Sequence, residues 1–262
     1  MKTAQAGWVY LVGAGPGAAD LITVRGLRIL RSADVVLHDA LVTPDLLREA
    51  RADAEIISAG KRGYCLGSMR QEVIHETLIR LARAGRSVCR LKGGDPYVFG
   101  RGGEEAEALA QAGVPFEVIP GITAVLGACA AVQIPLTHRA VGPAVVLATG
   151  HHDPDGPDCK LDWESLAHIG NVAFYMASRY RAAIARRLME HGLSPTTAAA
   201  VIEKATTPEQ RLVVATLADF ACDVTLPNEI GPSLFLVGEC VQYRNGRYLP
   251  WQSQSFAEVT IP

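Results

Sequence analysis

Short apolar segments alternate with helical periodicity along the first half of the chain. Runs such as "WVYLV" and "DVVLH" are brief, apolar and rich in β-branched residues, as buried strands are. We therefore predict strands at residues 8–12, 34–38, 54–58, 86–91 and 116–119. Between them, apolar positions recur with a helical period and predict helices at 23–33, 69–85 and 103–113. Strands and helices that alternate in this way are typical of βαβ units with a mostly parallel sheet.

A second set of elements follows the proline- and glycine-containing stretch at residues 135–143. The pattern predicts strands at 144–150, 171–176, 197–203 and 233–239, a helix at 178–192, and either element at 209–217. The stretch at 135–143 is the best candidate linker. We therefore predict two α/β domains of ordinary size, residues 1–138 with a mostly parallel sheet and 139–262 with a mixed sheet.

Composition narrows the class of protein. The 262 residues are 49% hydrophobic and 20% charged, which is typical of a soluble α/β protein, and the net charge of -2 provides no general attraction for nucleic acid. Six scattered cysteines without a CxxC pair argue against a disulfide framework and a structural zinc site. No apolar run is long enough for a membrane span or a signal peptide, so we expect a cytoplasmic protein with no membrane partner.

The loop "GAGPGAAD" follows the first predicted strand directly. Gly13, Gly15 and Ala18 satisfy the G-x-G-x-x-G/A pattern of dinucleotide-binding proteins, and Asp39 ends the next strand, where a ribose-binding acid would stand. In that motif, however, the helix begins inside the glycine turn, whereas the helical pattern here begins near Thr23. An NAD-dependent oxidoreductase therefore remains the alternative from a different reaction class.

Two further glycine-containing loops, "LKGGDPYVFGRGG" and "VIPGITA", also follow predicted strands. The carboxyl ends of parallel strands meet at one edge of a sheet, where open α/β folds bind ligands. The glycine pair Gly93 and Gly94 lets the backbone approach a ligand, and Asp95 can accept hydrogen bonds from hydroxyl or ammonium groups. The amides of Thr123 and Ala124, at the start of a helix, can attract a carboxylate.

An ordered set of motifs resembles the uroporphyrinogen-III C-methyltransferases of the tetrapyrrole methylase family. The motifs are "VYLVGAGPGAADLITVRGLRILRSADVVLHDALV", "GKRGY", "RLKGGDPYVFGRGGEEAEAL", "VPFEVIPGITA", "IPLTHR" and "ATGH", and the similarity runs from about residue 8 to about residue 240. The resemblance implies two α/β domains that hold S-adenosylmethionine in the cleft between them, usually as a homodimer and without a metal. Because this region occupies the whole chain, we expect no attached dehydrogenase or chelatase module.

The resemblance also implies roles for individual residues. It assigns proton acceptor to Asp39 and proton donor to Lys61. It places contacts with the methyl donor at Pro16, Gly93, Gly94, Asp95, Val98, Thr123, Ala124, Met176 and Ala205. Because the tetrapyrrole substrate is a polycarboxylate, basic loop residues are candidates to bind it, and arginine suits a carboxylate best. These candidates are Lys61, Arg62, Arg101, His138 and Arg139.

The implied reaction converts uroporphyrinogen III to precorrin-2 by two successive methylations, at C2 and C7, and releases two molecules of S-adenosylhomocysteine. A sulfonium carries its own leaving group, so the protein must align the substrate, exclude water and supply a base. Ala40, Ala140, the Gly142–Pro143 pair and Ala205 depart from the common family pattern. A precorrin methyltransferase acting at another ring position is therefore an alternative, as is a tetrapyrrole-binding protein without turnover.

Three of the implied site residues also have plain structural interpretations. A strand-end aspartate such as Asp39 often caps the following turn. A loop lysine such as Lys61 is usually solvated. A methionine after an apolar strand, such as Met176, often fills a core. Adjacent His151 and His152 lack the spacing of a metal site, so we predict no metal there.

Overall fold

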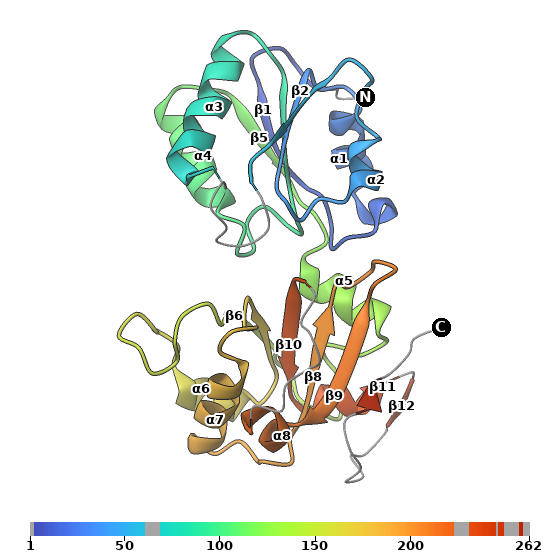
Figure 1. The fold of residues 1–262 in the computed structure, drawn as a ribbon, viewed down its shortest axis with the longest axis vertical. Coiled ribbons are helices and arrows are strands. Elements are labelled where there is room, and N and C mark those ends of the chain that lie inside the picture. The colour runs from blue at the N-terminus through green and yellow to red at the C-terminus, as the bar shows by residue number, and fades with distance from the viewer. Residues whose placement is uncertain (1–2, 61–68, 223–230, 245, 249–256, 259–262) are drawn as a thin grey trace. The chain divides into compact units, whose positions relative to one another are not determined.

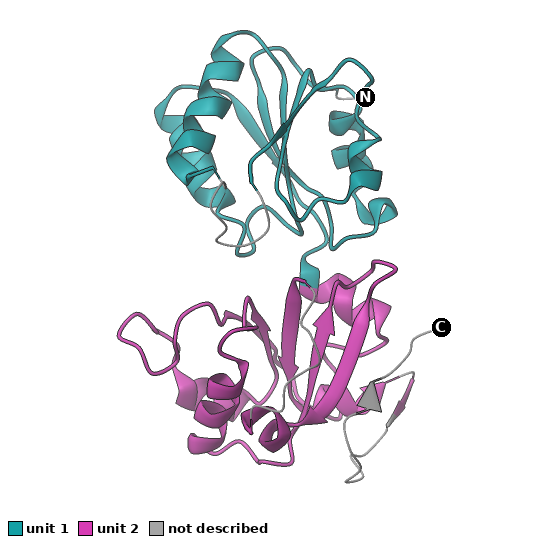
Figure 2. Cartoon of the chain, viewed as in Figure 1, with its two compact units in different colours: residues 1–124 teal, residues 125–262 magenta. Residues whose placement is uncertain are grey.

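The structure is a computed structural model that describes residues 3–60, 69–222, 231–244, 246–248 and 257–258. It divides into two compact units, Met1–Ala124 and Val125–Pro262 (Figure 2). The second unit thus begins before the expected boundary at residue 139. The stretch predicted as a linker lies inside this unit, where His138 bridges to Gly142 and its ring stacks on Tyr243. Proline and glycine there mark a turn within a unit.

The first unit is built on a sheet of five parallel strands in the order β3-β2-β4-β1-β5. Its strands are β1 (Val9–Gly13), β2 (Val35–His38), β3 (Glu55–Ser58), β4 (Val88–Lys92) and β5 (Phe116–Ile119). All four pairings are parallel. The five strands predicted for this half of the chain, and the parallel character of their sheet, are confirmed.

Helices cover both faces of this sheet (Figure 1). They are α1 (Val24–Leu30), α2 (Pro44–Leu47), α3 (Gln71–Arg83) and α4 (Gly102–Gln111), with a 3-10 turn η1 (Ala19–Leu21) before α1. The chain moves across the sheet in one direction from β1 through β2 to β3, and in the opposite direction from β3 through β4 to β5. Because crossovers between parallel strands are right-handed, α1 and α2 lie on one face of the sheet and α3 and α4 lie on the other. Strand β4 lies between β1 and β2 in the sheet. The loop after β4 leads to α4 on one face, whereas the loops after β1 and β2 lead to α1 and α2 on the other face. The carboxyl end of β4 is a topological switch point, where such folds bind ligands.

The second unit contains a mixed sheet in the order β13-β9-β8-β10-β7-β6. Its strands are β6 (Val146–Thr149), β7 (Val172–Tyr175), β8 (Ala198–Glu203), β9 (Arg211–Thr216), β10 (Ser233–Val237) and β13 (Ala257–Glu258). Strands β6 and β7 are parallel and the other pairs antiparallel, which confirms the predicted mixed sheet. The remaining elements are α5 (Ala124–Ala131), α6 (Trp163–Ile169), α7 (Arg181–Glu190), α8 (Leu217–Ala221), η2 (Glu239–Gln242), β11 (Tyr243–Arg244) and β12 (Arg247–Tyr248).

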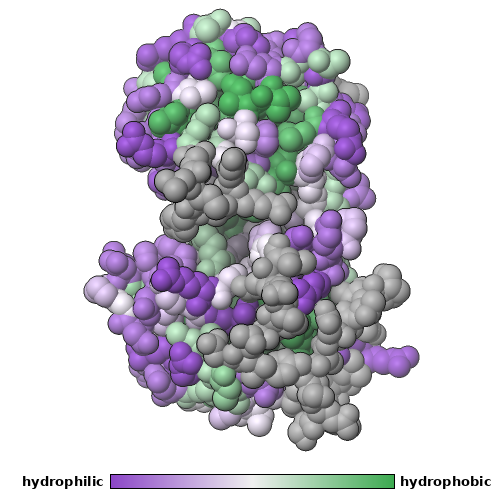
Figure 3. Space-filling model, viewed as in Figure 1, coloured by the Kyte–Doolittle hydropathy of each residue, from purple (hydrophilic) through white to green (hydrophobic). Residues whose placement is uncertain are grey.

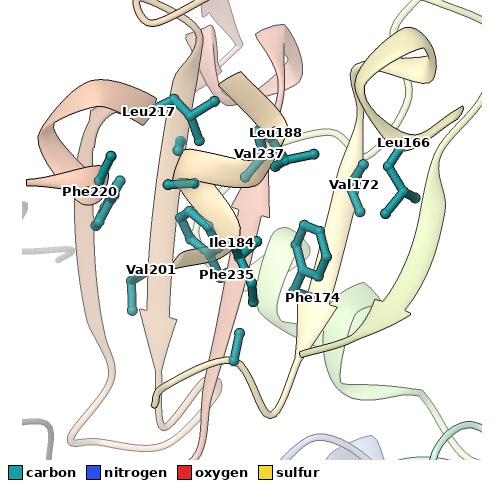
Figure 4. Packing of buried hydrophobic residues seen from close by; sticks show 14 of the residues in the cluster. Leu166, Val172, Phe174, Ile184, Leu188, Val201, Leu217, Phe220, Phe235 and Val237 are labelled. Carbon is teal, nitrogen blue, oxygen red and sulfur yellow. The ribbon is translucent and has the colours of Figure 1, made fainter. Parts of the chain in front are cut away.

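An aromatic cluster lies at the centre of the second unit's core (Figure 4). The rings of Phe174 on β7 and Phe235 on β10 stack with centroids 6.2 Å apart, and Phe220 on α8 meets Phe235 edge-on at 5.2 Å. Helices α6, α7 and α8 contribute apolar residues to the same core. Phe235 contacts both other rings and therefore joins the sheet to α8.

Within the described residues, no helix combines the length and apolar character needed to cross a bilayer. Many residues on the face seen in Figure 3 are hydrophilic, although apolar residues are also visible on the first unit.

The loops after β1, β4 and β5 meet at the carboxyl edge of the parallel sheet. Gly15 and Gly94 exchange backbone hydrogen bonds, with N–H to carbonyl distances of 3.2 and 2.8 Å. A Cβ on Gly13 would lie 2.5 Å from the Gly121 Cα, and one on Gly121 would lie 2.7 Å from the Gly13 Cα. Real Cβ atoms essentially never come within 3.0 Å of another heavy atom in this way. The three loops can therefore meet only because these positions lack side chains.

We expect Phe235→Ala to lower the free energy of unfolding by about 3–5 kcal/mol, because it leaves a cavity between three packed elements. Denaturant titration followed by circular dichroism measures this change. Ile169→Ala, at a side chain that is 38% exposed, is the control and should cost less than about 1 kcal/mol. Equal effects of the two variants would contradict this description of the core.

We expect Gly121→Ala to destabilise the first unit by roughly 1–3 kcal/mol, because its methyl group forces the loops after β1 and β5 apart. Gly103→Ala, in α4, is the matched control, since a Cβ there meets nothing within 4 Å. Thermal melts should show a clear loss for Gly121→Ala and little change for Gly103→Ala. A Gly121→Ala protein that melts with the wild type would show that the loops have room to separate.

Candidate active site

Asp95 joins two of the three loops at the edge of the parallel sheet. Its Oδ1 accepts a hydrogen bond from the Tyr97 amide at 2.8 Å, and its Oδ2 accepts one from the Gly121 amide at 3.0 Å. The carboxylate thus holds the loop after β5 against the loop after β4. Any ligand contact made by Asp95 would come in addition to this structural role.

The other predicted donor-binding residues of the first unit lie around Gly94. An ideal Cβ on Gly94 would stand 3.5 Å from the Ala124 nitrogen and 3.8 Å from the Thr123 Cα. The backbone of Gly94 has φ +68°, a conformation that glycine adopts without strain. Half-buried Pro16 directly follows Gly15, which is hydrogen-bonded to Gly94.

Val98 and Gly93 lie in the same loop after β4. The amide of Val98 donates to the carbonyl of Asp95 at 3.4 Å, so it lies in the turn that Asp95 begins. A Cβ on Gly93 would meet the Leu41 side chain at 2.9 Å, so this glycine lies against the loop after β2. The structure therefore brings together all the donor-binding positions predicted in the first unit.

Left-handed backbone conformations concentrate in the predicted site loops. Non-glycine residues with positive φ among those described are Phe99, Arg101, Gln133, Met176, Lys204 and Thr206. Five of these six lie in or beside segments that carry a predicted site residue; Gln133 does not. Such conformations cost energy and are retained where the surrounding structure enforces them, often at functional sites.

Met176 and Ala205 follow the carboxyl ends of β7 and β8, at one edge of the second unit's sheet. Strands β7 and β8 both run antiparallel to β10, and Leu234 pairs with residues on each, so their carboxyl ends are level. Met176 follows β7 with φ 56° and a side chain that is 50% exposed, so it does not fill the core. Buried Ala205 lies between Lys204 and Thr206, both left-handed.

Asp39, the predicted proton acceptor, directly follows β2. Its amide donates to the carbonyl of Leu91 on β4. Leu91 is two residues before Gly93, so Asp39 lies beside the carboxyl end of β4. Its side chain is 29% exposed, and its Oδ1 lies 2.6 Å from the Arg90 Nη2. The carboxylate therefore forms an ion pair in a partly exposed position, and the turn-capping interpretation does not account for it.

Arg90 belongs to a buried charged cluster that sequence analysis missed. On β4, Val88 points toward α3 and α4, and strand alternation sends Arg90 and Lys92 to the same face. Glu105 on α4 meets both: its Oε1 lies 3.0 Å from Arg90 Nη2 and 2.8 Å from Lys92 Nζ. All three side chains are at most 2% exposed.

The charges of this cluster balance, since Arg90 and Lys92 face Glu105 and Asp39. Burial alone would disfavour the charged guanidinium of Arg90, but the Asp39 and Glu105 carboxylates raise its pKa overall. Burial, followed by repulsion from Arg90, lowers the pKa of Lys92. The signal in the sequence was two cations at alternate positions of an otherwise apolar strand, together with an acid one turn into the next helix.

The predicted substrate-binding residues that the structure describes belong to both units, with Arg101 in the first and His138 and Arg139 in the second. Arg101 forms a bidentate ion pair with Glu104, which raises the pKa of its guanidinium. In the second unit, the exposed His138 ring stacks on Tyr243 with centroids 4.0 Å apart, and Arg139 is exposed. Lys61 and Arg62 lie outside the described residues.

The described residues contain no group of three or more His, Cys, Asp or Glu side chains that could hold a metal ion. The His151 and His152 rings lie 3.7 Å apart, and burial, followed by the charge of His152, lowers the pKa of His151. On β4, burial raises the pKa of Cys89 to about 12, which keeps the thiol protonated and unreactive.

The curated proteins that this chain resembles include siroheme synthases from several bacteria. A siroheme synthase of Neisseria meningitidis is 50% identical over 239 residues, which cover 90% of this chain and 48% of that protein. The chain thus spans about half the length of the curated relatives it matches.

Two solved structures match at higher coverage. A uroporphyrin-III C-methyl transferase from Thermus thermophilus, complexed with S-adenyl homocysteine, has 38% identity and a TM-score of 0.76 over 89% of this chain and 93% of that one. A cobalt precorrin-4 methyltransferase has 30% identity and a TM-score of 0.79 over 90% and 96% of the two chains.

The family model of the tetrapyrrole (corrin/porphyrin) methylases matches residues 8–221, and it spans both units. The chain therefore belongs to the tetrapyrrole methylase family.

Proposed function

We propose that this chain is an S-adenosylmethionine-dependent C-methyltransferase that converts uroporphyrinogen III to precorrin-2. One observation carries the proposal: the three glycine loops converge at the switch point of the parallel sheet, beside a partly exposed carboxylate at the end of β2. The similarity to a uroporphyrin-III C-methyl transferase complexed with S-adenyl homocysteine supports both the donor and the substrate class. A cytoplasmic location and a homodimer are part of the same proposal.

In this proposal, the methyl donor binds where the loops after β1, β4 and β5 meet. Gly93 and Gly94 admit the donor close to the backbone, and the first amides of α5 at Thr123 and Ala124 attract its carboxylate. Pro16, Asp95 and Val98 complete the donor contacts in the first unit. Met176 and Ala205 contribute from loops of the second unit, where enforced left-handed backbone supports a binding role.

The chemistry requires no protein nucleophile. An electron pair from a pyrrole carbon forms the new C–C bond, the C–S bond breaks with its electrons remaining on sulfur, and S-adenosylhomocysteine leaves. The methylated ring system is then cationic and loses a proton, which the Asp39 carboxylate accepts. Lys61 returns a proton or binds a substrate carboxylate. The fixed site contributes alignment and excludes water from the reacting atoms.

Basic side chains bind the acid groups of the macrocycle in this proposal. Arg62, Arg101 and Arg139 present planar guanidinium groups that suit bidentate carboxylate binding, and His138 adds a further donor. Arg101 is already paired with exposed Glu104, and exchange of one carboxylate for another would be inexpensive at the surface.

A second candidate is a precorrin methyltransferase that acts at another ring position. The departures at Ala40, Ala140 and the Gly142–Pro143 pair favour it, because they lie in loops assigned to the substrate. The similarity to a cobalt precorrin-4 methyltransferase also supports it.

Methyl counting tests the proposed reaction directly. We expect anaerobic incubation with S-adenosylmethionine and uroporphyrinogen III to yield a tetrapyrrole with two added methyl groups by mass spectrometry. One added methyl group would contradict conversion to precorrin-2 but retain the methyltransferase class. No added methyl group to uroporphyrinogen III or to any precorrin, with S-adenosylhomocysteine binding intact, would contradict the enzymatic proposal.

We expect Asp39→Asn to lower kcat by about 100- to 10,000-fold, because the amide cannot accept the proton. The affinity for S-adenosylhomocysteine, measured by calorimetry, should stay within about twofold of the wild type, since the substitution preserves shape. Asp45→Asn, at a 70% exposed side chain on α2, is the matched control. A fully active Asp39→Asn enzyme would show that another group accepts the proton.

A further inference from the structure

We propose that Glu105 is a positioning residue, which holds the Arg90 guanidinium in the orientation that fixes the Asp39 carboxylate. The inference rests on the proposed function of Asp39 as the proton acceptor. It assigns a role to a side chain that is 0% exposed and cannot itself reach a substrate.

The Arg90 guanidinium is held on several sides. Its Nε and Nη2 donate to Glu105 Oε1 at 3.2 and 3.0 Å, and its Nη1 donates to the Leu37 carbonyl at 3.5 Å. Its Nη2 also lies 2.6 Å from Asp39 Oδ1. The side chain is 2% exposed, so water cannot replace a lost partner. A planar guanidinium with these contacts cannot turn without breaking at least one of them.

This arrangement distinguishes the two oxygens of Asp39. Oδ1 is engaged by Arg90, whereas Oδ2 has no hydrogen-bond partner within the part of the chain that the structure describes. The side chain is 29% exposed, so a ligand can reach it. Oδ2 is therefore the oxygen that accepts the substrate proton, and the guanidinium fixes its direction.

Glu105 also connects Asp39 to the glycine loop that follows β4. The same Oε1 that binds Arg90 accepts a hydrogen bond from Lys92 Nζ at 2.8 Å, and Lys92 is the last residue of β4 before Gly93 and Gly94. The Lys92 carbonyl in turn accepts from the Ala14 amide in the first glycine loop. One buried carboxylate thus fixes both the base and the strand end that precedes the glycine pair.

Removal of Glu105 alone would deprive both buried cations of the buried carboxylate that they share and leave only the partly exposed Asp39, which would destabilise the protein strongly. Two double variants avoid this difficulty. Glu105→Leu with Lys92→Met and Glu105→Gln with Lys92→Met both remove one charge of each sign. They differ chiefly in the acceptor at position 105, because glutamine retains an oxygen that can bind Arg90 and leucine does not. Glu107→Gln, at an exposed position of α4, is the surface control.

For the leucine variant we expect kcat to fall about a hundredfold, the order of loss for a misplacement of about 1 Å. KM for the donor and the affinity for S-adenosylhomocysteine should stay within about threefold. The glutamine variant should keep kcat within about tenfold of the wild type, and Glu107→Gln should match the wild type. If Glu105 only balanced charge, both double variants would behave alike; equal kcat values in the two would overturn the proposal.

A crystal structure of the leucine variant provides a test that does not depend on turnover. We expect the Asp39 carboxylate to leave its position against Arg90 Nη2, and an unchanged Asp39 rotamer would overturn the proposal. Should the wild type transfer no methyl group, the proposed function would fail by itself, and this comparison would still decide whether Glu105 orients Asp39.

Discussion

The close backbone contact between Gly13, Gly94 and Gly121 is the constraint on which the site depends. Any side chain at Gly13 or Gly121 would overlap backbone atoms of a neighbouring loop, so the loops after β1, β4 and β5 can form one surface only with glycine there. Strand order places the same loops side by side, and Asp95 fastens two of them together. Topology thus determines where the surface lies, and the absence of side chains allows the backbone to line it.

A second constraint lies beneath that surface. Arg90, Lys92 and Glu105 lie beside the apolar cluster between the sheet and helices α3 and α4, and Gln71 of α3 also donates to Glu105 Oε1 at 3.3 Å. Buried ion pairs of this kind are often no more stabilising than apolar residues of similar volume, so stability alone does not explain them. A fixed orientation for Asp39, which only a planar and well-anchored guanidinium provides, accounts for their presence.

Much of the fold could be predicted from local pattern. Apart from β9 and β13, the strands of both sheets matched predicted apolar runs. The start of α1 was predicted near Thr23, whose side chain accepts a hydrogen bond from the Gly26 amide. Because α1 begins there, the first glycine turn is followed by the short turn η1, and no helix opens inside it as the dinucleotide motif requires. The segment at 209–217, predicted as either element, is strand β9 up to Thr216, and α8 begins at its last residue, with Thr216 and Asp219 forming a capping box at the junction. Local pattern could not have shown where β9 ends, since both elements are apolar.

What the sequence did not reveal depends on contacts between distant segments. Arg90 and Glu105 are 15 residues apart and join only when α4 packs on β4. The stretch at 135–143 resembles a linker in sequence, whereas the compact units divide at residue 124 and His138 packs on Tyr243 far along the chain. The convergence of the predicted site positions in the first unit could be expected from the sequence, because each follows a strand and parallel strands bring their carboxyl ends to one edge.

In the proposed function, the glycine-lined edge of the parallel sheet binds a sulfonium methyl donor rather than a dinucleotide. Calorimetric titration of the full chain with S-adenosylhomocysteine, and separately with NAD, tests it most directly. We expect saturable binding of S-adenosylhomocysteine at one site per chain, weakened by Gly94→Val, and no binding of NAD. Tight binding of NAD without binding of S-adenosylhomocysteine would contradict it.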